Sequence, residues 1–494
     1  MILLYIITLI VLLSFYNIYR YYKKLINSSS VPIIHDAFSL FKNRIYRITL
    51  KDLFKRIRII GELTNERGGV TKFFFGPLVI HVVSSPEDAS TVLSLCLEKM
   101  FLYFMIEPYI GRELLAAPVS VWKTNRRLIN HAFKQSVLDG YIEVFNKQSE
   151  RLAAAMAEKV NEEFNFTEII TKISVETVCQ TIMGIDVNNK DIITDNYVKA
   201  INRVLQIIVS RFTRPWLMID FIFYWTSLKK EQDECLKLMW NLSDQLVKLR
   251  KSEHIKRLKN NEKNHEKGNR MQNSLDILIE NTVTEDNEIL TDLQLRQLID
   301  NLISAGFDTT STQLLIVLIN IGSHPDVQTK IYEEVINVMG DKDRLISKND
   351  LSRFTYLEAV LKESIRLYPI SPLLARKSTT NVQLSNYILP AGCNILVHLW
   401  AVNRNRNYWG PDADDFRPER WFDDSVSSHP AAFASFSLGR RNCIGKSYAM
   451  SFMKIVVANI VRKFTISADE KKLELEYAIL LKPIGGNLMK IKPR

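Results

Sequence analysis

Cysteine, glycine and proline are all scarce in this chain of 494 residues, which holds five cysteines, 17 glycines and 15 prolines. The cysteines stand far apart and form no Cys-x-x-Cys pair, which argues against a disulfide framework or a zinc ribbon. The sequence also lacks a Pro/Gly/Ser-rich linker, an internal repeat and a nucleic-acid-binding motif. These absences favour one large domain in a compartment that keeps thiols reduced.

The composition is that of an ordinary globular protein, with 47% apolar and 24% charged residues. The chain is therefore long and apolar enough to bury a large core. Its formal net charge of +11 is compatible with a nucleic acid, an anionic membrane surface or an acidic protein partner. Charge alone does not separate these partners, although no motif supports nucleic acid.

The first 19 residues carry no charge and are followed at once by Arg20, Lys23 and Lys24. As a helix they would span about 28 Å, close to the thickness of a bilayer core. A signal peptide would place its positive charges before the apolar run rather than after it. The sequence therefore predicts a membrane anchor at 1–19, a basic linker at 20–60 and one domain at 61–494. By the positive-inside rule, everything after the anchor faces the cytosol.

Helical periodicity dominates from about residue 87 to 334, after two β-rich runs that meet at Gly76-Pro77. Residues 248–270 are too charged to be buried and predict a solvated helix end and loop, or alternatively a domain boundary. The clearest helix begins at the capping box of Thr291 and Gln294 and ends at Gly322. Its middle, SAGFDTTST, is unusually polar for a buried helix, which indicates a functional site.

A single cysteine stands in FASFSLGRRNCIGKSYAM, where Phe436, Gly439, Arg441, Cys443 and Gly445 form the pattern FxxGxRxCxG. The glycines permit a tight loop whose amide hydrogens can converge on the sulfur, and Arg441 favours the thiolate. The default interpretation is a buried apolar residue. A cysteine hydrolase would need a nearby base, and only His429 is close in sequence. A thiolate that is the sole protein ligand of a haem iron fits better.

A haem needs cations for its propionates, and a reaction with dioxygen needs protons. Trp122, Arg126, Arg376 and Arg441 are the predicted propionate contacts, although each alone is more often a surface residue. Asp308 and Thr309 are the predicted proton relay, with Gly306 leaving room for oxygen. The alternative makes Thr309 a core hydroxyl bonded to its own helix. Glu363, Arg366 and Arg420 are predicted to form a buried charge network that holds the cysteine loop.

Taken together, WKTNR, AGFDTT, ESIR, FRPERW and FSLGRRNCIG resemble the cytochromes P-450, the haem-thiolate monooxygenases, in the family's order. The resemblance implies a mainly α fold with small β-sheets (α+β). It also implies haem b held between the long helix and the cysteine loop, with Phe436 shielding the sulfur. Within the family the chain resembles the insect members of the fatty-acid ω-hydroxylase group (family 4). Many of those carry a glutamate where this chain has Ala305, so covalent haem attachment by that route is excluded, and Phe307 replaces a frequent histidine.

The resemblance also implies partners and a location. Electrons from NADPH would arrive through NADPH–cytochrome reductase, with cytochrome b5 as a second donor, at basic contacts on Arg126, Arg127, Lys134, Arg440 and Lys446. The expected location is the endoplasmic reticulum membrane, and the expected substrates are fatty acids, hormone-like terpenoids or xenobiotics. Two rivals stay open: a haem-thiolate enzyme that rearranges peroxides, and a haem-binding sensor or carrier without turnover.

Overall fold

The structure is a computed structural model that describes Tyr16, Arg20 and residues 30–34, 49–75, 78–185, 195–259, 271–283, 288–340, 344–423 and 429–494. Its contacts divide the chain into two compact units, and the single domain predicted from the sequence stays a prediction. The first unit consists of residues 1–100, 371–413 and 427–442, and the second of 101–370, 414–426 and 443–494. Apart from Tyr16, the predicted anchor lies outside the described residues. The predicted boundary at residue 61 falls inside a helix that begins at Leu50.

The first unit is built on a mixed sheet with strand order β1-β2-β7-β4, in which β2 and β7 are parallel and the other pairs antiparallel. As the sequence predicted, β1 and β2 flank Gly76-Pro77 and a helix begins at Pro86. The elements are α3 (Leu50–Glu66), β1 (Val70–Phe75), β2 (Leu78–Val83), α4 (Pro86–Leu95), β4 (Leu374–Lys377), β5 (Val382–Gln383), β6 (Ile388–Leu389), β7 (Asn394–Val397), α18 (Leu399–Val402), α19 (Arg406–Trp409) and the 3-10 turn η5 (Pro430–Ala432).

The second unit is mainly helical, with two small sheets of order β3-β11-β8 and β10-β9. Its helices are α5 (Glu107–Ile110), α6 (Val119–Ile129), α7 (Gln135–Gly140), α8 (Ile142–Ala157), α9 (Thr167–Met183), α10 (Asp195–Thr213), α11 (Asp220–Tyr224), α12 (Ser227–Lys259), α13 (Ser274–Thr282), α14 (Asp292–Ser323), α15 (Pro325–Met339), α16 (Lys348–Arg353), α17 (Thr355–Leu367) and α20 (Lys446–Lys463). Its strands are β3 (Glu163–Asn165), β8 (Phe464–Ser467), β9 (Glu474–Ala478), β10 (Leu480–Gly485) and β11 (Leu488–Pro493), and its 3-10 turns are η1 (Phe101–Met105), η2 (Asn130–Phe133), η3 (Pro215–Met218), η4 (Pro418–Phe422) and η6 (Glu470–Lys472).

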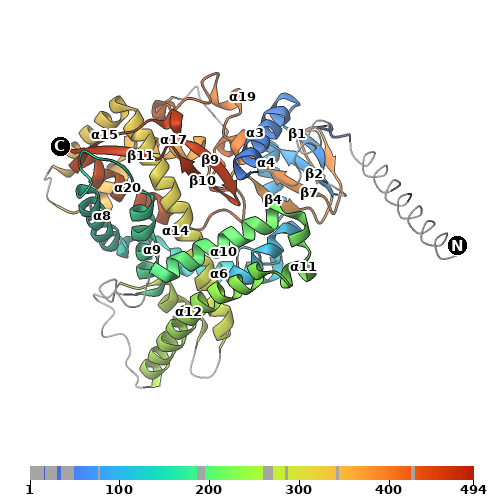
Figure 1. Cartoon of the computed structure of the whole chain (residues 1–494), viewed down its shortest axis with the longest axis horizontal. Coiled ribbons are helices and arrows are strands. Elements are labelled where there is room, and N and C mark those ends of the chain that lie inside the picture. The colour runs from blue at the N-terminus through green and yellow to red at the C-terminus, as the bar shows by residue number, and fades with distance from the viewer. Residues whose placement is uncertain are drawn as a thin grey trace. The chain divides into compact units, whose positions relative to one another are not determined.

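Helix α14 forms the core of the second unit, where α9 and α20 pack against it (Figure 1). It begins at the predicted capping box, in which Thr291 and Gln294 satisfy each other's backbone amides. Among the described residues it is the helix that is long and apolar enough to cross a membrane, but most of its apolar window is buried in protein. Core packing therefore accounts for its hydrophobicity.

The charged stretch at 248–270 begins as the last turns of α12, which continue to Lys259, so the predicted helix end is confirmed up to that residue. The rest of this stretch lies outside the described residues.

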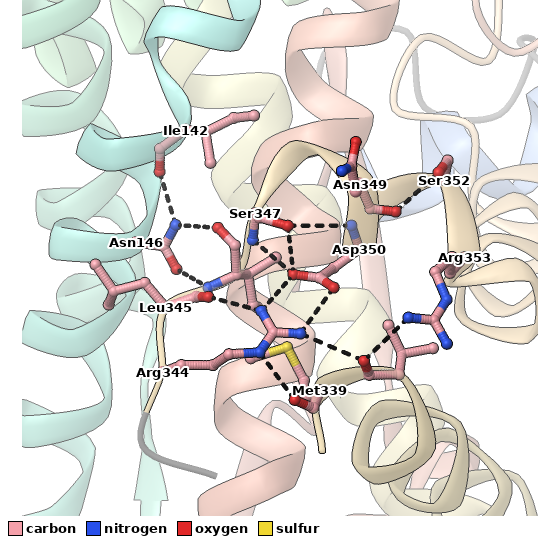
Figure 2. A network of polar contacts seen from close by, with 12 residues as sticks. Ile142, Asn146, Met339, Arg344, Leu345, Ser347, Asn349, Asp350, Ser352 and Arg353 are labelled. Atoms are coloured by element: carbon pink, nitrogen blue, oxygen red, sulfur yellow. Dashed lines mark hydrogen bonds and ion pairs between the residues drawn. The ribbon is translucent and has the colours of Figure 1, made fainter. Parts of the chain in front are cut away.

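A polar network around Arg344 fastens the segment after α15 to its neighbours (Figure 2). The guanidinium of Arg344 donates to both carboxylate oxygens of Asp350, at 2.6 and 2.8 Å, and to the carbonyl of Met339. On the other side, Asn146 of α8 exchanges hydrogen bonds with the backbone of Ile346. The Arg344 and Ser347 donors hold the pKa of Asp350 well below its usual value. The network therefore joins α8, α15 and α16 through a short irregular segment.

Candidate active site

Cys443 lies three residues before α20, and Gly445 is the N-cap of that helix. Part of the Cys443 side chain is exposed, yet protein atoms crowd its sulfur, and this desolvation raises the pKa of the thiol. The amide of Gly445 and the charges of Arg126 and Lys446 act in the opposite direction and favour the thiolate. The sequence assigned this electrostatic role to Arg441, and the second unit instead supplies it from Arg126 and Lys446. A metal ion at the sulfur would add the remaining stabilisation of the thiolate.

Helix α6 carries two of the predicted propionate contacts one turn apart. Trp122 is buried, and the Arg126 Nε donates to the Oδ1 of Asn130 at 3.1 Å. Burial lowers the pKa of Arg126, whereas the nearby Cys443 raises it. Within the second unit, Arg126 thus lies close enough to Cys443 for their charges to interact.

The first unit gathers the two other predicted propionate contacts around a lysine that the sequence did not reveal. Arg376 on β4 and Arg441 are 1% and 8% exposed. Burial and the charges of these two arginines lower the pKa of Lys99 well below its usual value. This cluster therefore gathers positive charge that can pair with an anion. Lys99 carries no motif, and only the fold brings it to the arginines.

The loop before Cys443 needs glycine at position 439 for two reasons. Its φ is +68°, and a Cβ there would lie 2.6 Å from the carbonyl oxygen of Leu93. Gly445 differs, because its φ is −84° and a Cβ would meet only the Cys443 sulfur at 3.9 Å. The half-buried Phe436 packs edge-on against Phe433, with ring centroids 6.4 Å apart. The sequence prediction of glycine-dependent loop geometry therefore holds at Gly439.

In the middle of α14, the predicted relay residues have separate partners. The buried carboxylate of Asp308 forms an ion pair with Lys482 of β10. The Thr309 hydroxyl donates to the Ala305 carbonyl at 2.7 Å, and the side chain is half-buried. Phe307 is fully buried, whereas Ala305 is exposed. The sequence did not predict Lys482, because a lone lysine in a strand carries no signal of a helix partner 174 residues away.

Gly306 serves the packing of α14 against α9, which the sequence did not predict. A Cβ at this position would lie 3.2 Å from the Cγ2 of Val178 on α9. The missing side chain therefore makes room for Val178 and lets α9 and α14 approach each other closely. That Gly306 also leaves room for oxygen stays a prediction, because the Val178 contact concerns only the direction of the missing Cβ.

Glu363 on α17 is the centre of the predicted charge network. Arg366 donates to both of its oxygens at 2.8 Å, and the Arg420 Nε donates to Oε1 at 2.7 Å. The Trp421 indole N–H and the Arg417 backbone N–H complete the set at 3.1 Å each. The side chains of Glu363, Arg366 and Arg420 are fully buried. The network is confirmed, but what it fastens to α17 is the segment 415–421 rather than the cysteine loop.

Comparison with known proteins agrees with this arrangement, since a family model described as cytochrome P-450 matches residues 53–490. The chain is a cytochrome P-450. Cytochrome P-450 4V2 of Mus musculus is 28% identical over 96% of this chain and 92% of its own length. Two Drosophila melanogaster relatives are cytochrome P-450 4c3, at 28% over 96% of this chain and 90% of its own, and cytochrome P-450 4d1, at 30% over 82% and 81%.

Membership of this family confirms the predicted fold class and the predicted type of enzyme. A cytochrome P-450 is a haem monooxygenase with cysteine thiolate ligation, electrons from a reductase and a lipophilic substrate. The predicted resemblance to insect members of family 4 is confirmed by the Drosophila relatives.

Proposed function

We propose that this protein is a membrane-anchored monooxygenase that hydroxylates or epoxidises a lipophilic substrate, with Cys443 as the axial ligand of haem b. The observation that carries the proposal is the place of Cys443 just before α20, where desolvation raises the pKa of the thiol and the Gly445 amide, Arg126 and Lys446 oppose this rise, so that a cation at the sulfur would complete the stabilisation of a thiolate. Fatty acids, hormone-like terpenoids and xenobiotics are the substrate classes. The names of the relatives place them in family 4 and state no substrate.

The residues present fit a haem. A haem carries two carboxylates, and the half-buried Lys99 with the buried Arg376 and Arg441 gathers positive charge that such carboxylates can pair with. We assign the propionates to this cluster in the first unit, and from the sequence pattern we keep Trp122 and Arg126 of the second unit as proposed haem contacts, with Phe436, Gly439 and Gly445 shaping the cysteine loop. When bound, the haem supplies the activation of dioxygen, and this chemistry benefits from a strong thiolate donor.

Protons would be moved by Asp308 and Thr309. Thr309 is half-buried on the same side of α14 as the exposed Ala305, one turn away, and its hydroxyl can exchange its bond to the Ala305 carbonyl for one to a ligand. Asp308 is the adjacent ionisable group and can be re-protonated from water after giving up a proton. A hydroxyl beside a carboxyl is suited to passing protons in single steps.

We place the enzyme in the endoplasmic reticulum membrane, with its catalytic part facing the cytosol. Besides the N-terminal apolar run, an exposed apolar surface in the second unit supports membrane contact. Over η3 and α11 it contains Trp216, Ile219, Phe221, Ile222, Tyr224 and Trp225, with Phe221 and Trp225 each 76% exposed. Clustered exposed tryptophan and tyrosine suit a membrane–water interface.

The electron donors in this proposal are NADPH–cytochrome reductase and cytochrome b5. Arg126, Arg127, Lys134, Arg440 and Lys446 are the proposed basic contacts, and acidic surfaces on the donors would steer the encounter. Charge reversal at the exposed Arg127 should slow reduction and make it less dependent on salt, while leaving substrate binding unchanged.

The function is tested by incubating the purified protein with NADPH, a reductase and a panel of lipophiles that includes long-chain fatty acids and terpenoids. The expected result is substrate-dependent NADPH oxidation matched by a product containing one oxygen atom from dioxygen. Product formation from peroxides without NADPH would instead show a peroxide-rearranging enzyme. Binding without any product would show a carrier.

The relay is tested by Thr309→Ala in the same assay. We expect NADPH oxidation to continue while product formation falls several-fold and hydrogen peroxide release rises. Thr310→Ala is the matched control, because Thr310 is the neighbouring threonine and is buried. Unchanged coupling in Thr309→Ala would mean that Thr309 only bonds to its own helix.

A further inference from the structure

The hairpin of β9 and β10 brings Lys482 to α14. Strand β10 packs on α14 (Figure 1), and the buried Leu481 donates its amide to the Ile370 carbonyl at 2.8 Å. At the hairpin tip Ile479 has a φ of +69°, which is costly for a β-branched residue. The ladder register shifts just beyond Lys482, between Pro483 and Gly485. Lys482 is therefore held between a strained tip and a bulge.

Lys482 lies between two carboxylates that belong to different elements. It forms an ion pair with Asp308 of α14, and directly across the hairpin its register partner is Glu476 of β9. Cross-strand partners have Cβ atoms about 4.5–5.5 Å apart, so the ammonium can reach either acid. Burial raises the pKa of Glu476, and the Lys482 charge lowers it. Within the described part of the chain, the Glu476 carboxylate forms no ion pair or hydrogen bond, although its backbone is paired in the β9–β10 ladder.

Two features allow the ion pair between Lys482 and Asp308 to break easily. A lysine offers one charge on a flexible stem, unlike the two-pronged grip of an arginine. The Lys482 side chain is 29% exposed, so water can solvate its ammonium when it leaves Asp308. The buried Asp308, at 6% side-chain exposure, has much less access to water and depends on its partner.

We propose that Lys482 is a positioning residue that alternates between Asp308 and Glu476. Paired with Asp308, it holds that carboxylate in the ion pair and away from proton transfer. Paired with Glu476, it frees Asp308 to take up a proton from water and then to pass it toward the reaction site, so the carboxylate is unchanged over a cycle. This inference rests on the proposed relay role of Asp308.

The resting pair is tested by thermal unfolding of the ferric holoenzyme in a double-mutant cycle. Lys482→Met and Asp308→Asn should each lower Tm, and the double variant should lower it by less than the sum of the two shifts. Lys482→Arg should restore most of the wild-type Tm. Lys490→Met, a change of an exposed strand lysine on β11, is the control and should leave Tm nearly unchanged. If the two Tm shifts simply add in the double variant, Lys482 and Asp308 do not form a stabilising pair.

The alternation is tested by the solvent deuterium isotope effect on product formation. Glu476→Gln should lower the rate several-fold and enlarge this isotope effect, with the substrate dissociation constant unchanged in a spin-shift titration. In the Lys482→Met background the same Glu476→Gln change should have no further effect, because no ammonium remains to be exchanged. An equal effect of Glu476→Gln in both backgrounds would overturn the alternation.

The two proposals fail in different ways. If Asp308→Asn changes neither the coupling of NADPH to product nor the isotope effect, the relay role of Asp308 is wrong. If Asp308→Asn changes both, while Glu476→Gln changes neither, the relay stands and only the alternation of Lys482 is wrong.

Discussion

Two buried carboxylates on neighbouring helices of the second unit, Glu363 on α17 and Asp308 on α14, are held in opposite ways. Glu363 accepts five hydrogen bonds, four of them from arginine or tryptophan side chains and the fifth from a backbone amide. Asp308 has one ion pair, to a lysine that is 29% exposed. The number and kind of donors therefore separate a permanent fastening from a releasable one.

This difference agrees with the positions of the two residues. Glu363 fastens the segment 415–421, which has little regular structure of its own and depends on side-chain bonds. Asp308 lies beside Thr309 in a helix whose backbone is already satisfied, so its pair adds less to the fold than the Glu363 network does. A carboxylate that must move protons cannot be enclosed by two arginines.

The largest effect that tests this comparison is expected for Glu363→Gln. The change leaves the charges of Arg366 and Arg420 buried without a counter-charge, so the free energy of unfolding should fall by about 3–5 kcal/mol. Urea denaturation followed by tryptophan fluorescence measures this. Asp308→Asn is the matched control and should cost clearly less, because the Lys482 ammonium can turn to water. Equal costs would break the comparison.

Exchanging the two kinds of cation should give the next largest effect. Arg366→Lys loses the two-pronged contact with Glu363 in a fully buried site, so we expect a loss of about 1.5–3 kcal/mol in unfolding free energy. Lys482→Arg keeps its charge at a half-buried site and should change the same quantity by less than about 1 kcal/mol. A larger loss for Lys482→Arg than for Arg366→Lys would show that Asp308 is the more tightly held acid.

The smallest effect concerns Glu358, a partly exposed carboxylate on the same helix as Glu363. Burial raises its pKa, but hydrogen bonds from Lys362 and Lys454 outweigh this and lower the pKa to about 2. Because the folded-state pKa lies below the unfolded value, Glu358 stabilises the protein above about pH 4.5, and this contribution is lost as the pH falls toward 2. In a plot of unfolding free energy against pH, Glu358→Gln should reduce the loss between pH 4.5 and pH 2 by no more than about 1 kcal/mol. Glu143→Gln, at an exposed position, is the control. An equal change in the two variants would show that Lys362 and Lys454 do not lower the pKa of Glu358.

Local patterns allowed much of the structure to be predicted. The start of α14 follows from Thr291 and Gln294, since a capping box acts within one turn of helix. The left-handed backbone at Gly439 and the partnership of Glu363 with Arg366 also depend on nearby residues or on a dense motif. In these cases the interacting groups are close in sequence, so a local sequence pattern is enough to predict their contact.

Other features depend on contacts between distant segments and carry no local signal. Lys482 meets Asp308 only because a hairpin packs on α14, and Lys99 joins Arg376 only through the packing of the first unit. The packing of Gly306 against Val178 on α9 likewise comes from the fold, because nothing near Gly306 in the sequence points to Val178. The boundary predicted at residue 61 fell inside α3 because basic residues on one face of an amphipathic helix resemble a linker.

The central claim is that Cys443 is the thiolate ligand of a haem, and the carbon monoxide difference spectrum of the reduced protein tests it most directly. The wild-type protein should give the red-shifted Soret band of a thiolate-ligated haem. Cys443→Ala should lose this band, while Cys179→Ala, a change at a buried cysteine elsewhere in the second unit, should keep it. A thiolate-type band that persists in Cys443→Ala would contradict the account.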